Sequence, residues 1–303
     1  DITLYETALE LNEIVVKGEG LSKRNRTETI TTVSLKTIKE LHLTSPLDVL
    51  NQVPGVEIGA YNQGGVADAF MLRGFSGAGH EGQAAIEVDG VSLNEGEGNH
   101  DGYADMNLII PINLSKVDVY KGPSSALFGR FGVAGTLAFE TRKGGEYQDL
   151  SLKGGSFETI DAQIALGKPF EFGERTLKTN FAAQMYRTAG YKENSGFLKG
   201  NLNGSIGYQL TDKTDIALNL KAYSGIWDAT GYIPTEQFYD RSQRNKQALN
   251  AENDGGAKNF ASERIDVNHT INDNLRLLVF GYSVQQNSQR FLKFFYEPGG
   301  QAE

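Results

Sequence analysis

The sequence of 303 residues contains no cysteine, which excludes disulfide scaffolds, thiol catalysis and Cys-ligated metal sites together. It has no run of about 18 apolar residues and therefore predicts no transmembrane helix. Asp1 begins the chain without a basic and apolar leader, so we expect that any secretion signal has been removed. Positive charge is in the minority, with a net charge of -9. Because a nucleic-acid surface needs a basic face to release counterions from phosphates, no nucleic-acid partner is expected.

Glycine is abundant, with 36 residues against seven prolines, and it is spread through the whole chain. This composition favours many turns and bulges over long helices. The character of the sequence changes near Gly144, and a chain of this length can hold two domains. We predict an N-terminal arm at residues 1–30, a first domain at residues 31–145 and a region of strands at residues 146–303.

The first domain has mixed α/β character. Ser34 is placed to cap a short helix, and Ser45 with Pro46 is a second cap and first-turn pair. Pro54 and Gly55 end the second helix. Short apolar runs separated by Gly, Asn and Asp clusters predict a small sheet with long polar loops. These runs are residues 56–58, 69–72, 85–88, 117–120 and 136–139.

After Gly145 polar and apolar residues alternate with a period of two. Leu218 and Leu220 share one face of a predicted strand, while Asn219 and Lys221 share the other. A soluble β-sandwich also alternates in this way, but repeats of about 9 to 14 residues are typical of tilted strands that cross a bilayer. The pattern recurs at residues 160–166, 177–185 and 202–210 and is less regular at residues 275–284.

The predicted connections are alternately short and long, as in a chain that crosses a bilayer repeatedly, except that the first outward turn, residues 154–157, is tight. Residues 167–174, 211–214 and 272–274 are brief, whereas residues 188–199 and 226–259 are longer. About seven strands cannot close around the preceding domain, and an open sheet edge in hydrocarbon would leave unpaired backbone groups. We therefore expect the protein to continue past Glu303.

Residues 11–18 form a short β-branched run between polar residues within the arm. Such a run can pair edge-on with a strand of a partner protein. It can equally be an edge strand of the chain's own first domain, and the spacing alone does not distinguish the two.

Five short motifs follow one another along the chain. They are EIVV at residues 13–16, VPGV at 53–56, MLRGF at 71–75, IEVDGV at 86–91 and VYKGPSSALFG at 119–129. In this order they resemble the TonB box and the plug motifs of the TonB-dependent outer-membrane transporters. The resemblance implies a mixed α/β plug domain inside the lumen of an antiparallel membrane β-barrel of 22 strands, of which about seven are present here.

The resemblance also implies a function. TonB, with its inner-membrane energising complex, would bind the TonB box by strand addition, through Glu13, Ile14, Val15 and Val16. The transporter would import a scarce nutrient across the outer membrane of a Gram-negative bacterium, with outer-membrane lipid around the barrel. A ferric siderophore or other metal chelate is the first expectation, and an oligosaccharide, peptide or cobalamin-like ligand is the alternative. No catalytic residue, cofactor or resident metal is implied, and a surface lipoprotein partner is left open.

Candidate ligand-binding residues come from the loops that the family order places on the outward side. The alternative is that these are ordinary solvated loops with no role in binding. They are, however, rich in groups that can bind a metal chelate. The candidates are Tyr61, Gln63, His80, Glu81, Gln83, Asn99, His100 and Tyr103 in the plug loops, with Trp227 and Tyr232 in the long loop at residues 226–259.

The rival from another class is an outer-membrane barrel enzyme or an adhesin. No Ser-His-Asp arrangement or metal-ligand spacing supports an enzyme. The GxGxxG match at residues 77–82 precedes a predicted strand instead of opening a helix, which argues against a dinucleotide site. The EF-hand-like start at Glu97 lacks the acidic twelfth position, where Leu108 stands.

Overall fold

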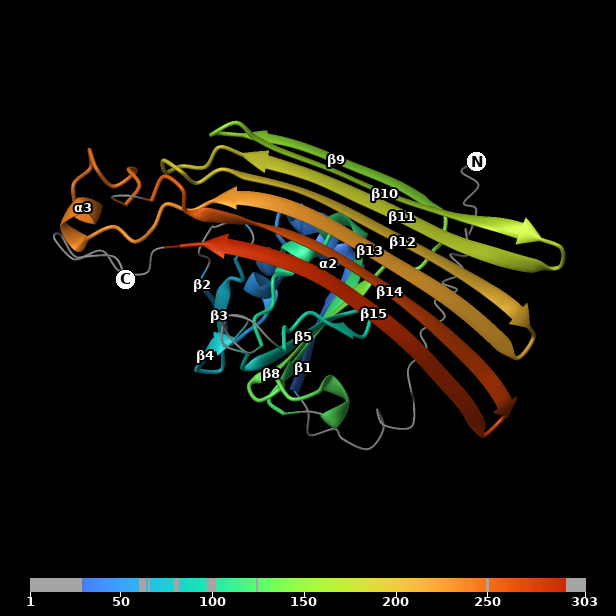
Figure 1. The fold of residues 1–303 in the computed structure, drawn as a ribbon. Coiled ribbons are helices and arrows are strands. Elements are labelled where there is room, and N and C mark those ends of the chain that lie inside the picture. Colours follow the sequence, from blue (N-terminus) through green and yellow to red (C-terminus); the bar gives the residue numbers. More distant parts are fainter. Residues whose placement is uncertain are drawn as a thin grey trace, which may run out of the picture.

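The computed structural model describes residues 29–59, 64, 66–78, 82–96, 102–123, 125–248 and 251–292, and the structural statements below concern these residues. They form two parts (Figure 1). An N-terminal unit, residues 29–141, lies on the concave side of a long, arched sheet of seven strands.

The N-terminal unit contains two sheets. The larger has the strand order β1-β7-β8-β5-β6, in which only the neighbours β5 and β8 are parallel, and the smaller has the order β2-β3-β4. The prediction of one small sheet was wrong, because the runs at residues 56–58 and 69–72 pair with each other and not with the remaining strands. The bounds are β1 Thr29–Ser34, β2 Val56–Gly59, β3 Ala69–Leu72, β4 Phe75–Ala78, β5 Ala84–Val88, β6 Val91–Ser92, β7 Leu114–Lys121 and β8 Gly135–Thr141.

Two predicted helices are present with the predicted caps. Ser34 caps α2 (Leu35–Leu41), its Oγ accepting from the backbone N–H of Thr37 at 3.4 Å. The second helix, η1 (Pro46–Gln52), is a 3₁₀ helix in which the Ser45 Oγ accepts from Leu47 N and the Asp48 carboxylate accepts from Ser45 N. The remaining short helices are η2 Met106–Leu108, η3 Pro111–Asn113, η4 Ala126–Phe128 and α3 Thr235–Tyr239.

The apolar core lies inside the N-terminal unit. Leu50, Leu72 and Ile86 are fully buried in it, together with residues from every strand of the larger sheet except β6. Two side chains of the seven-stranded sheet, Tyr223 and Phe260, join this core from outside the unit. A smaller apolar cluster joins Ile110 of the unit to Ala165 and Ala182 of the sheet.

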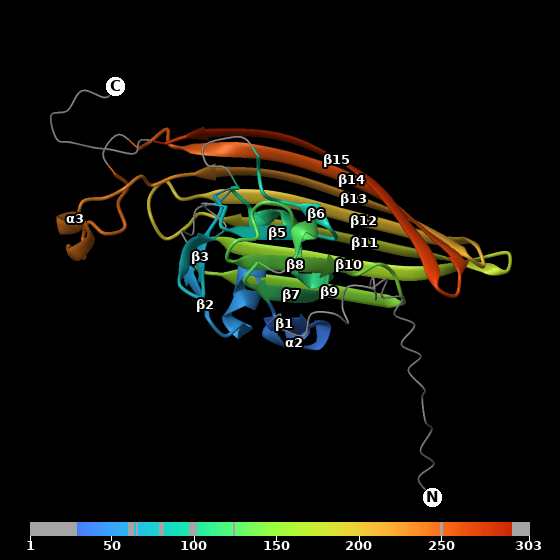
Figure 2. The ribbon, with the colours of Figure 1, turned by 90° about the horizontal axis from the view of Figure 1, so that it is seen from below.

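The seven-stranded sheet is antiparallel throughout, and each strand pairs with the next along the chain. Figures 1 and 2 show that the strands form one arched layer, so the soluble sandwich, which needs two packed sheets, is wrong. The bounds are β9 Tyr147–Gly155, β10 Thr159–Phe172, β11 Arg175–Thr188, β12 Phe197–Thr211, β13 Thr214–Asp228, β14 Gly255–Asn272 and β15 Leu275–Phe291.

Several strands are longer than the alternation predicted. Pairing of β10 with β11 continues to Phe172 and Arg175, so most of the predicted loop at residues 167–174 is strand. Trp227 also lies in β13, opposite Gly256, and its placement in the long loop was wrong. Backbone pairing continues wherever a neighbouring strand is present, whether or not the side chains alternate.

The connections define the two ends of the sheet. At one end, the turn end, residues 173–174, 212–213 and 273–274 join adjacent strands. At the other, the loop end, the connections are residues 156–158, 189–196 and 229–254. The loop that carries α3 projects past the strands at the loop end (Figures 1 and 2).

The faces of the sheet follow the predicted alternation. The face turned to the N-terminal unit is polar, with Gln163, Gln184 and Asn201 buried on it. The opposite, outward face is apolar and exposed, as in a sheet that borders lipid. Its exposed apolar side chains include Leu150, Leu152, Ile160, Leu166, Phe181, Met185, Leu202, Ile206, Leu218 and Leu220.

The outward face changes character across the sheet. On β10 the outward positions nearest the loop end are apolar, from Ile160 to Leu166. Leu198 of β12 and Ile226 of β13 are exposed and apolar at the same register as Ile160. At that register on β14 the outward positions include the exposed Asn259 and Glu263, with only alanines beside them, and large apolar residues begin at Ile265. The apolar outward face is therefore interrupted at β14.

Within the described residues, no helix has both the length and the apolar character needed to span a membrane.

Candidate functional site at the contact between the N-terminal unit and the sheet

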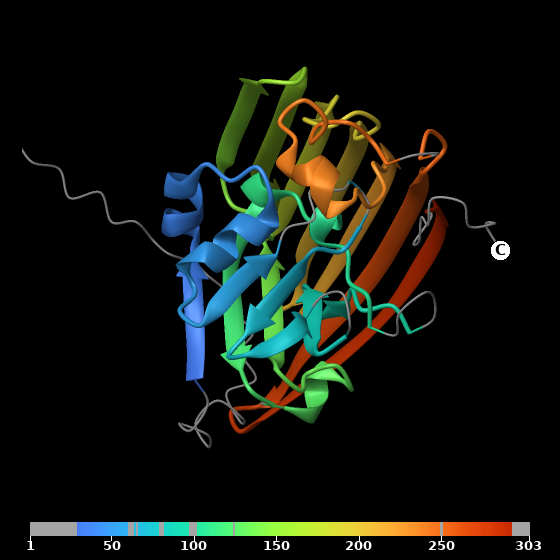
Figure 3. The same ribbon diagram turned by 90° about the vertical axis from the view of Figure 1, so that its left-hand side faces the viewer.

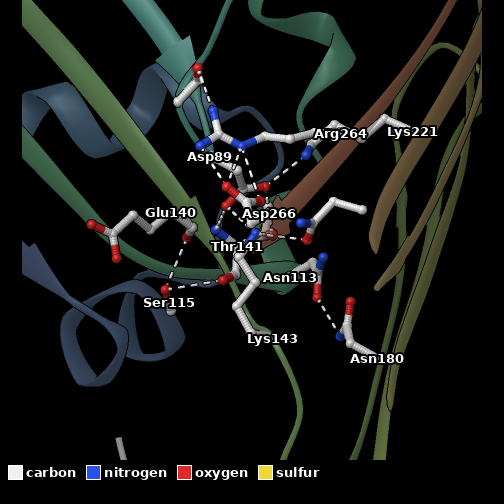
Figure 4. A network of polar contacts seen from close by, with 12 residues as sticks. Asp89, Asn113, Ser115, Glu140, Thr141, Lys143, Asn180, Lys221, Arg264 and Asp266 are labelled. Carbon is white, nitrogen blue, oxygen red and sulfur yellow. Dashed lines mark hydrogen bonds and ion pairs between the residues drawn. The ribbon is translucent and has the colours of Figure 1, made fainter. Parts of the chain in front are cut away.

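A buried carboxylate connects the N-terminal unit to strand β13. Asp89 follows β5 in a tight turn and has φ +54°, and only 3% of its side chain is exposed. It accepts hydrogen bonds from the backbone N–H and the hydroxyl of Thr141 at 2.9 and 2.8 Å. The ammonium groups of Lys143 and Lys221 each lie 2.6 Å from it (Figure 4). Lys221 is the partner that belongs to β13.

The charge state of Asp89 follows from these contacts. Burial by itself would raise the pKa of the Asp89 carboxyl, but the two lysines outweigh it and hold the pKa far below its usual range. The carboxylate is therefore ionised at physiological pH, and its contact with Lys221 of β13 is an ion pair.

Further charged contacts surround Asp89. Lys143 also donates to Asn219 Oδ1 of β13 at 3.0 Å. On β14, Arg264 donates to the backbone carbonyl of Gly90 at 2.9 Å and pairs with Asp266 of its own strand at 2.7 Å (Figure 4). Consecutive residues of one turn are thus held by two adjacent strands.

A second set of contacts lies closer to the loop end. The Lys258 ammonium of β14 is 2.8 Å from a Glu95 carboxylate oxygen. The Asn107 side chain of η2 accepts from Lys199 of β12 at 3.3 Å, and its backbone carbonyl accepts from Asn201 at 3.0 Å. The segment between Glu95 and Asn107 is therefore fixed to the sheet at both of its ends.

A third contact holds the end of α2. The Lys153 ammonium of β9 donates to the backbone carbonyls of His42 and Leu43 at 2.8 and 2.6 Å, and to the Thr44 hydroxyl at 3.2 Å. His42 is the left-handed C-cap of the helix, with φ +48°. Because the last carbonyls of a helix lack partners within it and carry partial negative charge, a cation is well placed there.

The loop end carries a groove of about 510 Å³ between residues 187–198 and the ends of β13 and β14. Asn194 donates to the backbone carbonyls of Ala229 and Asp254 at 2.8 and 3.3 Å, which fixes one loop to the other. The groove presents backbone groups, hydroxyls and the Asp228 carboxylate beside aromatic rings. Its lining includes Arg187, Thr188, Asn194, Phe197, Trp227 and Asp228.

The family model described as the TonB-dependent Receptor Plug Domain matches residues 22–136. Residues 22–136 belong to the plug domains of the TonB-dependent receptors. The N-terminal unit is this plug domain, the seven-stranded sheet has the fold of part of such a receptor's barrel wall, and the resemblance predicted from the sequence is confirmed.

Relatives and solved structures agree with this assignment. The vitamin B12 transporter BtuB of Vibrio vulnificus (strain CMCP6) is 25% identical over 275 residues, which cover 87% of this chain and 40% of that protein. The ferric citrate transporter FecA in the unliganded form has the same fold, with a TM-score of 0.73, 16% identity and coverage of 88% and 40%. The ferric yersiniabactin uptake receptor FyuA from Yersinia pestis has a TM-score of 0.66 and 16% identity, with coverage of 88% of this chain and 42% of that one. The chain spans about two-fifths of the length of these relatives.

Most of the residues predicted to bind TonB or ligand lie outside the described part of the receptor. They are Glu13, Ile14, Val15 and Val16 in the TonB box, and Tyr61, Gln63, His80, Glu81, Asn99 and His100 in the plug loops. Their roles stay predictions.

Four predicted ligand residues are described, and the structure does not bring them together in one site. The Gln83 carbonyl accepts from Ala134 N at 2.8 Å, and the Tyr103 hydroxyl accepts from Ala67 N. Both residues are half-buried inside the plug domain. Trp227 is buried on the lumenal face of β13, whereas Tyr232 is exposed in the loop beyond it.

Trp227 is close-packed against the wall of the receptor. A Cβ on Gly256 would lie 2.4 Å from Cζ2 of Trp227, so the indole requires a glycine at that position. Its Nε1 has no hydrogen-bond partner among the described residues. A buried indole donor without a partner costs free energy.

The sequence prediction missed the lysines that hold the plug. Lys153, Lys199, Lys221 and Lys258 come from four strands and all face the lumen. The sequence does contain a signal for them, namely a lysine on the polar face of a strand that alternates with a period of two. Lys221 is one such lysine. Their partners, such as Asp89, lie more than 90 residues away and carry no local signal.

Proposed function

We propose that this receptor is an energised importer in the outer membrane of a Gram-negative bacterium. A scarce nutrient binds at the loop end, TonB and its inner-membrane complex engage residues 13–16, and the plug moves to open a path. No covalent bond is made or broken. The proposal keeps the division into an arm at residues 1–30, a plug at residues 31–145 and a wall that begins at residue 146 and belongs to a 22-stranded barrel.

The observation that carries this proposal is the polar contact between plug and wall. Apolar contacts are confined to Tyr223 and Phe260 and to a small cluster of Ile110 with Ala165 and Ala182. The other described contacts are ion pairs and hydrogen bonds such as Asp89 with Lys221 and Lys258 with Glu95. Water can replace such contacts when they separate, so the net free energy of each is small compared with its strength in isolation. A plug held in this way can shift as a unit, whereas one with a continuous apolar seam could not.

The proposed ligand is a ferric siderophore or another metal chelate. The fold likeness to a ferric citrate transporter and a ferric yersiniabactin receptor supports this choice, as does the MLRGF sequence at residues 71–75. A cobalamin-like ligand is the second candidate, because the sequence relatives are vitamin B12 transporters. Direct binding of ferric chelates and cyanocobalamin to the full-length receptor distinguishes the two.

The test of energised import uses Ile14→Pro in the full-length receptor. Proline cannot donate a backbone hydrogen bond and therefore prevents strand addition at the TonB box. We expect uptake of the bound nutrient to be lost while binding to the cell surface is unchanged. Ile2→Pro, in the same arm but outside the box, is the matched control and should transport normally. Unchanged uptake in Ile14→Pro would reject the proposal, and an enzyme or adhesin would then be the better explanation.

A further inference from the structure

The connection between β13 and β14 is a folded loop. The Ala248 N–H donates to the Thr230 carbonyl at 2.7 Å, and Ala229, Ala248 and Ala251 are buried at its base. Beyond α3, the Asp240 carboxylate accepts from the backbone N–H and the hydroxyl of Ser242 at 2.8 and 2.7 Å. These contacts give the loop a defined shape.

The folded loop exposes aromatic side chains at its tip. Tyr232, Phe238 and Tyr239 are 61%, 57% and 77% exposed, and the rings of the last two meet edge to face with centroids 5.4 Å apart. Single exposed apolar residues are common on proteins, but a group of them on an ordered segment indicates a binding surface.

Two arginines accompany the aromatic side chains. Arg241 and Arg244 are exposed and lie three residues apart in the turn that follows α3. Across the described residues, no carboxylate pairs with either guanidinium. Asp240 is engaged by Ser242, and Glu193 of the neighbouring loop pairs with Lys246. The two guanidinium groups are therefore available to an anion from solution.

The position of the loop places these side chains at the entrance of the lumen. The loop projects beyond the strands at the loop end (Figures 1 and 2), and the end-on view shows α3 in front of the boundary between the sheet and the plug (Figure 3). A ligand that approaches the lumen from that end meets this loop before it reaches the plug.

We propose that Tyr232, Phe238, Tyr239, Arg241 and Arg244 form a capture surface for an anionic metal chelate whose metal-binding arms are aromatic rings, such as catecholates or phenolates. This inference rests on the proposed import function and names the ligand class. Aromatic faces stack on planar rings, and a guanidinium both neutralises negative charge and lies flat on a ring. Citrate and hydroxamate chelates have no such rings, and a carbohydrate has no charge for the arginines to bind.

A small ligand fits this surface better than a protein does. A stable protein interface buries about 800 Å² on each partner and uses about 20 to 30 residues a side. The capture surface offers five side chains. Five side chains are enough for a small molecule, which is held by a few well-placed groups.

The test measures equilibrium binding of three probes to the purified full-length receptor: a ferric tris-catecholate, a ferric trihydroxamate and ferric citrate. The variants are F238A/Y239A and R241Q/R244Q. Each should raise the Kd for the tris-catecholate about tenfold, which corresponds to about 1.4 kcal/mol. F238A/Y239A should leave the other two affinities unchanged, and R241Q/R244Q should leave the affinity for the trihydroxamate, whose iron centre is uncharged, unchanged. Phe172→Ala, which removes an exposed ring at the turn end, is the control and should change none of them.

Three outcomes would overturn this inference. If the receptor binds the trihydroxamate, citrate or cyanocobalamin and not the tris-catecholate, the ligand class is wrong while the importer function stands. If the variants weaken binding of all three probes equally, the loop acts by shaping the entrance of the lumen and not by recognising aromatic rings. If tight tris-catecholate binding is unaffected by both variants, the surface serves another partner, such as a protein. Failure of Ile14→Pro to stop uptake would separately reject the importer.

Discussion

Replacing Asp89 by asparagine tests whether the buried ion pair holds the plug to β13. The change keeps the shape of the side chain and an oxygen that can accept from Thr141, but it removes the charge between Lys143 and Lys221. Breaking a buried pair by removing one partner costs about 3 to 5 kcal/mol. We expect about 3 kcal/mol, because the Lys143 side chain is half exposed and can turn to water.

Hydrogen exchange at Thr141 measures this cost locally. The Thr141 N–H donates to Asp89 at 2.9 Å, so it exchanges when the turn separates from β8. A loss of 3 kcal/mol corresponds to roughly a hundredfold faster exchange, at 1.4 kcal/mol for each factor of ten. In the Lys221→Met background, Asp89→Asn should cost about 1 to 3 kcal/mol less than it does alone, because the effects of substituting two contacting residues are not additive.

Asp212→Asn is the matched control. Its carboxylate pairs with Arg175 at 2.9 Å at the turn end, where it is almost fully exposed, and exposed pairs contribute about 0 to 1 kcal/mol. Less than a threefold change in Thr141 exchange in Asp89→Asn, or full additivity with Lys221→Met, would refute the reasoning that this pair stabilises the contact.

Two further predictions concern the plug. Burial raises the pKa of Glu87 to about 7, with Asp89 and Glu140 adding to the effect and Arg264 opposing it. A carboxyl group whose pKa is raised by folding contributes stability that is present below about pH 4.5 and lost as the pH rises through 7. Glu87→Gln should therefore stabilise the plug by up to about 3 kcal/mol at pH 8 and leave its stability unchanged at pH 4. An effect on thermal unfolding that does not depend on pH would contradict this. Gly135 has φ +153°, and a Cβ there would lie 2.1 Å from the Tyr120 carbonyl oxygen, so Gly135→Ala should cost about 2 to 4 kcal/mol of unfolding free energy. Gly132→Ala, where the nearest atom is 3.4 Å away, should cost under about 1 kcal/mol, and equal losses in the two variants would reject the steric argument.

The local structure of the plug could be read from the sequence because its signals are local. Ser34 and Ser45 cap their helices as predicted, since a capping side chain bonds to backbone two or three residues away. The faces of the wall strands were also predicted, because alternation decides which side chains are polar. Leu218 and Leu220 are exposed on the outward face and Asn219 is buried on the other.

The contacts between plug and wall could not be predicted in the same way. Alternation shows that Lys221 faces the lumen, but not that it meets Asp89, which is 132 residues away in sequence. The position of Trp227 was missed because β13 continues for as long as β14 can pair with it, through Asp228 opposite Gly255. Such features depend on tertiary pairing, which has no signature within a short window of sequence.

The outward face of β14 decides what can lie beside this edge of the sheet. Ile160, Leu198 and Ile226 share one register on β10, β12 and β13 and are exposed, whereas on β14 the large apolar side chains begin at Ile265, eight residues beyond Ala257 of that register. At about 3.4 Å per residue, the apolar surface steps back by about 27 Å between two adjacent strands. A consequence is that hydrocarbon suits β13 up to its loop end, while the first half of β14 is suited to water. A solute diffusing over the cell surface therefore has access to the outer side of the strand that follows the loop bearing α3.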